Sequence, residues 1–134
     1  MCLKQRVQKA KNALPFIGIT QRDKNGKPKT LVVPGSKGKK YRVILRREGG
    51  IITAECAKEL GHLGYENCKG NSHSLCYHSI AAIEFSLREA GFKSHWCETE
   101  KDAQRLFNAI GGTIFMAKSH SCNVMAFILI NKKG

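Results

Sequence analysis

Three cysteines and three histidines lie close together in the middle of the chain, and their side chains are of the kind that binds transition metals. They are Cys56, His62, Cys68, His73, Cys76 and His78. Zinc takes four thiolate or imidazole ligands in a tetrahedron, usually from two short pairs that a loop brings together. Cys76 and His78 stand two residues apart at the start of a predicted helix, where both side chains can face one ion. With Cys68 and one further ligand, they predict a zinc site.

A nucleophilic cysteine paired with a histidine is the enzymatic alternative. Cys76 with His78 and Cys97 with His95 are the candidate pairs. Residues two apart on a helix or a strand do not place their side chains for such a proton transfer. A zinc ion with four protein ligands also leaves no open position for a substrate. We therefore expect a structural metal and no enzymatic activity.

Three short strands before the cluster and one helix after it must position these ligands. Apolar residues between turn-forming ones predict strands at 31–33, 41–45 and 51–55. Apolar residues at helical spacing predict a helix over 77–90, which Gly91 ends. Cys56 then follows a strand, while Cys76 lies at a helix N-terminus, a position that favours the thiolate.

The remaining elements are predicted at the two ends of the chain. A basic amphipathic helix over 3–14 precedes Pro15, and a capping sequence at 99–102 opens a second helix that runs to 110. Strands at 113–117 and 124–130 are expected to form a C-terminal hairpin. The apolar stripe expected to be buried on the second helix consists of Ala103, Leu106, Phe107 and Ile110.

These elements predict an α+β fold with a small antiparallel sheet tied to a helix by a structural zinc site, followed by a helix and a C-terminal β-hairpin. One domain is expected over residues 1–134. It divides into a basic N-terminal helix and linker (1–28), the hairpin with the zinc finger (29–91), and a C-terminal α/β extension (92–134).

The sequence Cys76-Tyr-His78-Ser-Ile-Ala-Ala-Ile resembles the second half of a SWIM-type zinc finger. The pattern of that family is Cys-x-Cys, a variable loop, and then Cys-x-His running into an alanine-containing apolar helix, all preceded by a small β-hairpin. The segments before and after the cluster resemble those of small stand-alone phage and microbial members, so the resemblance covers most of residues 29–130. Only the Cys-x-His and helix portion is specific. The resemblance implies a structural zinc ion and binding to DNA or to other proteins.

The first half of the finger departs from the family pattern. The family would place a cysteine two residues after Cys56, where this chain has Lys58. Either Cys56 and Cys68 replace the close pair, with eleven residues inserted between them, or His62 or His73 substitutes for one of them. Because the first-half ligands of the family are cysteines, the resemblance favours one set of ligands for Zn2+, namely Cys56, Cys68, Cys76 and His78.

The net charge of +13 is confined to the first third of the chain. Residues 1–47 hold fourteen Lys and Arg against one acid, whereas residues 48–134 hold nine of each. Such a concentrated charge favours a polyanionic partner, and nucleic acid, DNA or RNA, is the commonest one inside a cell. The predicted phosphate contacts are Lys37, Lys39, Lys40, Arg42 and Arg46. The alternatives are a protein-interaction module, such as a phage-encoded adaptor or inhibitor of a host complex, and a solvated basic face.

Nothing in the sequence predicts a membrane-bound or secreted protein. No apolar run approaches the ~18 residues that span a bilayer, and the N-terminus lacks the apolar core of a signal peptide. We expect a cytoplasmic location (the host cell interior if the protein is phage-encoded) and neither a membrane nor a small-molecule partner. In a reducing compartment, clustered cysteines indicate a metal rather than disulfides.

Overall fold

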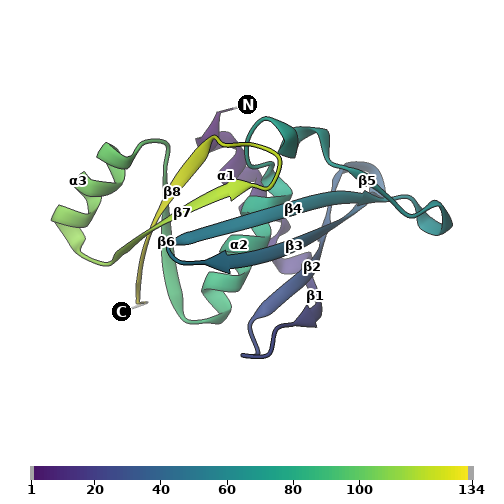
Figure 1. Cartoon of the computed structure of the whole chain (residues 1–134), viewed down its shortest axis with the longest axis horizontal. Helices are drawn as coiled ribbons and strands as arrows, with labels where there is room; N and C mark the ends of the chain where they lie inside the picture. The colour runs from purple at the N-terminus through teal and green to yellow at the C-terminus, as the bar shows by residue number, and fades with distance from the viewer. Residues whose placement is uncertain (1, 133–134) are drawn as a thin grey trace.

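The structure is a computed structural model that describes residues 2–132, and it has the mixed α+β composition predicted from the sequence (Figure 1). Its strands form one curled sheet in the order β1-β2-β3-β4-β7-β8-β6, with β5 beside the end of β4. Helices α1 and α2 lie together on one side of this sheet, and α3 lies apart from them (Figure 1). Within the described residues the elements are α1 (Leu3–Ala13), β1 (Gly18–Arg22), β2 (Pro28–Pro34), β3 (Lys40–Glu48), β4 (Ile51–Glu59), β5 (Tyr65–Asn67), α2 (Tyr77–Glu89), β6 (Phe92–Cys97), α3 (Glu100–Ile110), β7 (Thr113–Ser119) and β8 (Met125–Lys132).

The three strands expected before the cysteine cluster are confirmed as β2, β3 and β4. They form an antiparallel meander in which Leu31 pairs with Val43, and Val43 pairs with Cys56. The turn between β3 and β4 is formed by Gly49 and Gly50, and Gly49 has a φ of 60°, a left-handed value that favours glycine.

The sheet is larger than the small antiparallel sheet that was predicted, and it is not purely antiparallel. The C-terminal hairpin of β7 and β8 exists, but β7 also pairs in parallel with β4, in a register that sets Ile51 against Met116. The chain between these parallel strands supplies the long crossover that such a pairing requires. Strands β1, β5 and β6, which no sequence pattern predicted, complete the sheet.

Helix α2 is the centre of the hydrophobic core. Its residues from His78 to Glu84 are all buried, because the sheet covers one side of the helix and α1 packs against another. Ala10 on α1 and Ala81 and Ala82 on α2 are completely buried, and such small side chains let two helices approach closely. The N-terminal segment of α2, which carries two predicted metal ligands, is therefore held firmly in place.

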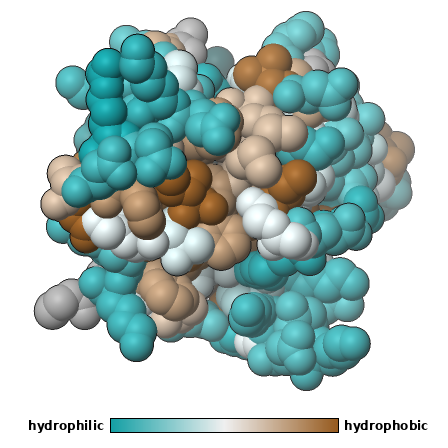
Figure 2. All heavy atoms as spheres, turned by 60° about the vertical axis from the view of Figure 1, so that its left-hand side comes forward, coloured by the Kyte–Doolittle hydropathy of each residue, from teal (hydrophilic) through white to brown (hydrophobic). Residues whose placement is uncertain are grey.

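The apolar stripe predicted for α3 is only partly buried, which corrects the expectation from the sequence. Ala103 is completely buried, but 38% of Phe107 and 48% of Ile110 are exposed. The helix packs mainly against β6, β7 and β8 at one end of the sheet. Apolar side chains are accordingly visible at the surface on the side of the molecule that carries α3 (Figure 2).

A buried carboxylate connects α2 to β6. The Glu84 side chain is only 3% exposed and accepts hydrogen bonds from Ser94 Oγ, from Trp96 Nε1 at 3.0 Å and from Arg88 Nε at 2.9 Å. Burial raises the pKa of the Glu84 carboxyl, but these three donors outweigh burial and bring its pKa below the ordinary value of 4.5. The ionised form is thus the one that the fold stabilises.

We expect Glu84→Ala to lower the free energy of unfolding by about 3 kcal/mol, because it leaves the buried donors of Ser94 and Trp96 without an acceptor. The pKa of Glu84 is lowered in the folded state, so its carboxylate stabilises the fold fully above pH 4.5. This stabilisation is lost as the pH falls through the pKa that Glu84 has in the folded protein. Urea unfolding at several pH values measures both effects. Glu98→Ala, at an exposed position, is the control. A loss no larger than that of the control would contradict this role.

Candidate metal centre

A β-hairpin brings Cys56 and Cys68 side by side. Strand β5 folds back along β4 so that Ala57 pairs with Asn67 and Glu59 with Tyr65. The same register continues to the two cysteines, where the backbone N–H of Cys68 donates to the carbonyl of Cys56 at 3.0 Å. The eleven residues between the cysteines therefore form a hairpin. This hairpin places Cys56 and Cys68, which are distant in sequence, opposite each other on adjacent strands.

The other two cluster residues come from the first turn of α2. Cys76 is the N-cap residue, and its Sγ accepts a hydrogen bond from the backbone N–H of Ser79 at 3.4 Å. His78 follows within the first turn, and its Nδ1 lies 3.9 Å from the Sγ of Cys68. The predicted position of Cys76 at the start of a helix is confirmed.

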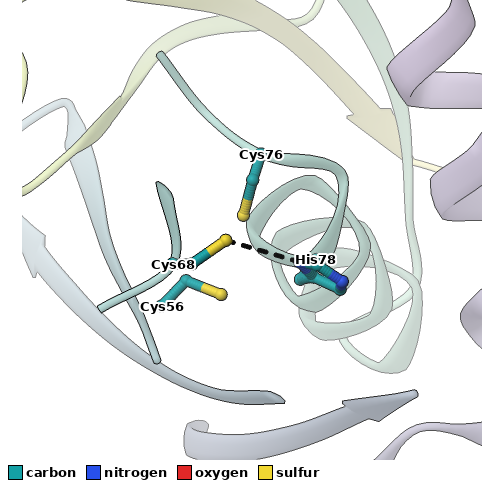
Figure 3. Close-up of side chains that lie close together, drawn as sticks. All are labelled: Cys56, Cys68, Cys76 and His78. Atoms are coloured by element: carbon teal, nitrogen blue, oxygen red, sulfur yellow. Dashed lines mark hydrogen bonds between the residues drawn. The ribbon is translucent and has the colours of Figure 1, made fainter. Parts of the chain in front are cut away.

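The four side chains converge on one point, which is the geometry that a metal ion requires (Figure 3). One ligand atom from each of Cys56, Cys68, Cys76 and His78 lies within 4.8 Å of the others. A tetrahedral site with Zn–S bonds of ~2.3 Å has ligand–ligand edges of ~3.8 Å, so small movements would close the site around an ion. Cys56, Cys76 and His78 are buried and Cys68 is partly buried. This group can hold a metal ion.

No protein-family model, curated protein or solved structure matches this chain. The SWIM resemblance therefore still rests on Cys76, His78 and the helix that follows them. No helix within residues 2–132 is long and apolar enough to cross a membrane.

The two histidines considered as alternative ligands lie outside the cluster. His62 and His73 are both exposed, and neither belongs to the group of converging ligand atoms. The carbonyl of His73 instead accepts a hydrogen bond from the Cys122 thiol at 2.9 Å. That contact connects the loop before α2 to the loop between β7 and β8.

Asn71 organises the loop that carries Cys68 toward Cys76, a role that no sequence pattern predicted. It is 2% exposed, and its Nδ2 donates to the carbonyl of Ala54 at 3.1 Å. Its Oδ1 accepts from the backbone N–H of Cys76 at 3.1 Å and from the Ser79 hydroxyl at 2.9 Å. One side chain thus joins β4, the loop and the N-terminus of α2. An asparagine between two candidate ligands was the only signal of this role in the sequence.

The ring of His78 is fixed between two tyrosines. The Tyr41 ring stacks on it with centroids 3.6 Å apart, and the Tyr77 ring lies 4.0 Å away on a tilted plane. Gly35 packs so closely here that a Cβ atom would lie 2.4 Å from the Tyr41 ring. The Nδ1 of His78 faces Cys68, while its buried Nε2 has no hydrogen-bond partner within the described residues. This orientation leaves Nδ1 as the atom available to a metal.

The three thiols influence one another's protonation. Hydrogen bonds from Cys56 and Cys76 bring the pKa of the Cys68 thiol below its ordinary value. The hydrogen bond that Cys56 makes to Cys68 raises the Cys56 pKa, and burial raises the pKa of Cys76 to about 11. Of the three thiols, Cys68 is therefore the one that loses its proton most readily. A divalent ion would remove the remaining protons, because metals bind the thiolate form.

Most of the predicted phosphate contacts lie at the same end of the sheet as the cluster, but Arg46 pairs with Thr53, nearer the other end of β3. Lys37, Lys39 and Lys40 are exposed in and beside the β2–β3 connection. Arg42 and Arg46 share the outer face of β3, whereas Arg47 faces inward. Arg42 lies over the Tyr65 ring, with 3.8 Å between its Cζ and the ring centroid. Arg46 forms an ion pair with Glu55 at 3.6 Å, which reduces the positive charge that it presents.

Two lysines outside the first third of the chain also reach this region. Lys58 pairs across the strands with Tyr41, and Lys58 and Lys69 line a hollow beside Cys68. On the other side of His78, the Nζ of Lys9 lies 4.5 Å from the centre of the Tyr77 ring. Basic residues from three separate segments thus surround the cluster, although the prediction placed all of them before residue 48.

Proposed function

We propose that the chain is a SWIM-like module held together by a structural zinc ion. The observation that carries the proposal is the convergence of Cys56, Cys68, Cys76 and His78 within 4.8 Å. Three thiolates and one imidazole suit zinc better than the hard cations calcium and magnesium, which prefer oxygen ligands. A fourth protein ligand completes the tetrahedron, so the metal would have no position for a substrate. The role is structural and the protein is not an enzyme.

The ion would join three parts of the fold that are distant in sequence. Cys56 belongs to β4, Cys68 follows β5, and Cys76 and His78 begin α2. Zinc binding to such a set contributes directly to folding, because the unfolded chain does not offer the site. The neighbouring Asn71 and the tyrosines around His78 would hold the ligands in place as the metal binds.

We expect protein purified without added metal to contain one zinc ion per chain. Elemental analysis and native mass spectrometry measure the stoichiometry, and far-UV circular dichroism during chelator titration measures the structural role. Loss of zinc should coincide with loss of ordered structure. A fully folded protein that contains substoichiometric zinc and is insensitive to chelators would exclude a structural zinc ion.

The basic surface around this centre supports nucleic-acid binding, DNA or RNA, as the role of the module. Lys39 and Lys40 are exposed and form no ion pair within the described residues. Tyr65 is 51% exposed beside Arg42, and an aromatic ring next to a guanidinium is a frequent feature of single-stranded nucleic-acid sites. Phosphate contacts of lysines carry no sequence information, so the proposed binding is insensitive to sequence. A cytoplasmic location, where thiolates stay reduced, fits both parts of the proposal.

The exposed side of α3 favours a second candidate, a protein-interaction module. Phe107 and Ile110 leave an apolar strip on the surface, and exposed apolar patches of this kind often mark interfaces with other proteins (Figure 2). A partner bound here would be retained after nuclease treatment, whereas one held through nucleic acid would be released. The charge-reversal experiment in the Discussion distinguishes the two functions.

A further inference from the structure

A cavity that shares no lining residue with the metal centre lies at the other end of α2. Its volume is about 420 Å³, which falls in the range of small-molecule sites. Its walls are mostly apolar and come from the C-terminal part of α2 and from the starts of β4, β6 and β7; among them are Ile51, Leu87, Ala90, Phe92 and Phe115. Such walls suit the hydrocarbon part of a ligand.

Two basic residues, Lys27 and Arg47, line this apolar cavity, and Arg47 is the one whose guanidinium is partly buried. Arg47 projects from the inner face of β3 and lines the cavity, where its guanidinium donates to the carbonyl of Pro28 at 3.1 Å and to the hydroxyl of Ser86. Both partners are neutral. Burial brings the pKa of Arg47 below its ordinary value. The negative charge of Asp23 acts in the opposite direction, but Asp23 is too far from Arg47 to form an ion pair.

No acidic side chain of the described residues neutralises Arg47. Glu89 is the one carboxylate that lines the cavity, and it is already paired with Arg22, whose two terminal nitrogens lie 2.6 and 3.2 Å from its oxygens. A guanidinium has five N–H donors, and neutral partners occupy only two of those of Arg47. The remaining donors can bind the two oxygens of a carboxylate side by side.

We propose that this cavity binds a small carboxylate with an apolar body, such as a medium-chain fatty acid. The carboxylate lies at Arg47, and the hydrocarbon chain lies along Leu87, Phe92 and Phe115. This site is independent of the metal centre and of the basic surface, because none of its lining residues belongs to either.

The probe for this site is sodium octanoate, and 1-octanol is its uncharged counterpart. Isothermal titration calorimetry measures both affinities on the full zinc-loaded chain. Arg47→Gln should weaken octanoate binding at least about tenfold and leave octanol binding nearly unchanged, because only the carboxylate requires the guanidinium. Arg46→Gln is the matched control, since Arg46 is the adjacent residue on the opposite face of β3. It should bind octanoate like the parent.

A second variant keeps the proposal testable if Arg47→Gln does not fold. Ala90→Trp introduces a large side chain at an exposed position on the rim of the cavity and should also reduce octanoate affinity at least about tenfold by filling the space. Two results would overturn the proposal. One is the absence of saturable octanoate binding to the parent chain, and the other is equal octanoate binding by the parent and a folded Arg47→Gln or Ala90→Trp variant.

Discussion

Replacing Cys76 with serine should release the zinc ion and unfold most of the domain at room temperature. Structural zinc contributes an apparent ~10–16 kcal/mol in small zinc domains, which is comparable to the ~5–15 kcal/mol stability of a whole domain. The same result is expected for Cys56→Ser, Cys68→Ser and His78→Ala, because all four side chains meet in one cluster. Zinc content and circular dichroism of the purified variants measure the effect.

Variants at nearby cysteine and histidine positions outside the cluster are the controls for destabilisation that any substitution in this region would cause. His62→Ala and His73→Ala, at exposed positions outside the cluster, should keep zinc and unfold at the temperature of the parent. Cys122→Ser should disturb only two surface hydrogen bonds, the one that the thiol donates to the carbonyl of His73 and the one that it accepts from the backbone N–H of Val124. Zinc loss in His62→Ala combined with zinc retention in Cys56→Ser would reverse the assignment of ligands.

Reversing the charge of Lys39, Lys40 and Arg42 to glutamate should weaken nucleic-acid binding on the order of a hundredfold at 0.1 M salt. Each lost phosphate contact lowers the slope of log K against log salt by about 0.9 on duplex DNA, so the triple variant should lose about 2.7. Fluorescence anisotropy with two duplexes of unrelated sequence measures both quantities. The two duplexes should be affected equally, because phosphate contacts do not read bases.

The control for this variant carries the same change of net charge at another place. Lys93, Lys101 and Lys132 are exposed residues on β6, α3 and β8, away from the β2–β3 connection. Reversing these three should leave the salt slope close to that of the parent. If both triple variants bind nucleic acid like the parent while zinc stays bound, the basic third of the chain is a solvated face. The protein-interaction function, with the exposed strip on α3, then becomes the better account.

The second half of the candidate site was predictable because its signals are local. Cys76, His78 and the apolar residues after them lie in one continuous segment, and the N-terminus of α2 presents both side chains wherever that helix packs. The meander β2–β3–β4 was predictable for the same reason, since each of its strands is bounded by turn residues.

The first half of the site depends on tertiary contacts that no local pattern encodes. Strand β5 has only three residues, all of them exposed, and forms because the edge of β4 is free beyond Ala54, where the pairing with β7 ends. That pairing is itself long-range. The spacing of the cysteines alone could therefore not show which residues bind a metal together with Cys56. Only the family resemblance suggested them.

Other features were missed because burial cannot be read from residue type. Glu84 and Arg47 are charged, and residue type alone assigns them to the solvent, yet hydrogen-bond partners from distant elements allow Glu84 to be buried and Arg47 to be partly buried. The opposite error occurs on α3, where the apolar Phe107 and Ile110 have the spacing of a core stripe but remain partly exposed. In each case the decisive information is which other segment lies nearby.

X-ray absorption at the zinc edge tests the central claim most directly, because it reports the ligands of the metal in solution. We expect one zinc ion per chain with three sulfur ligands at ~2.3 Å and one nitrogen ligand at ~2.0 Å. The Cys68→Ser variant, if it retains any zinc, should show a loss of sulfur coordination. A shell of nitrogen and oxygen ligands only, or no bound zinc in folded protein, would contradict the assignment of Cys56, Cys68, Cys76 and His78 as the metal centre.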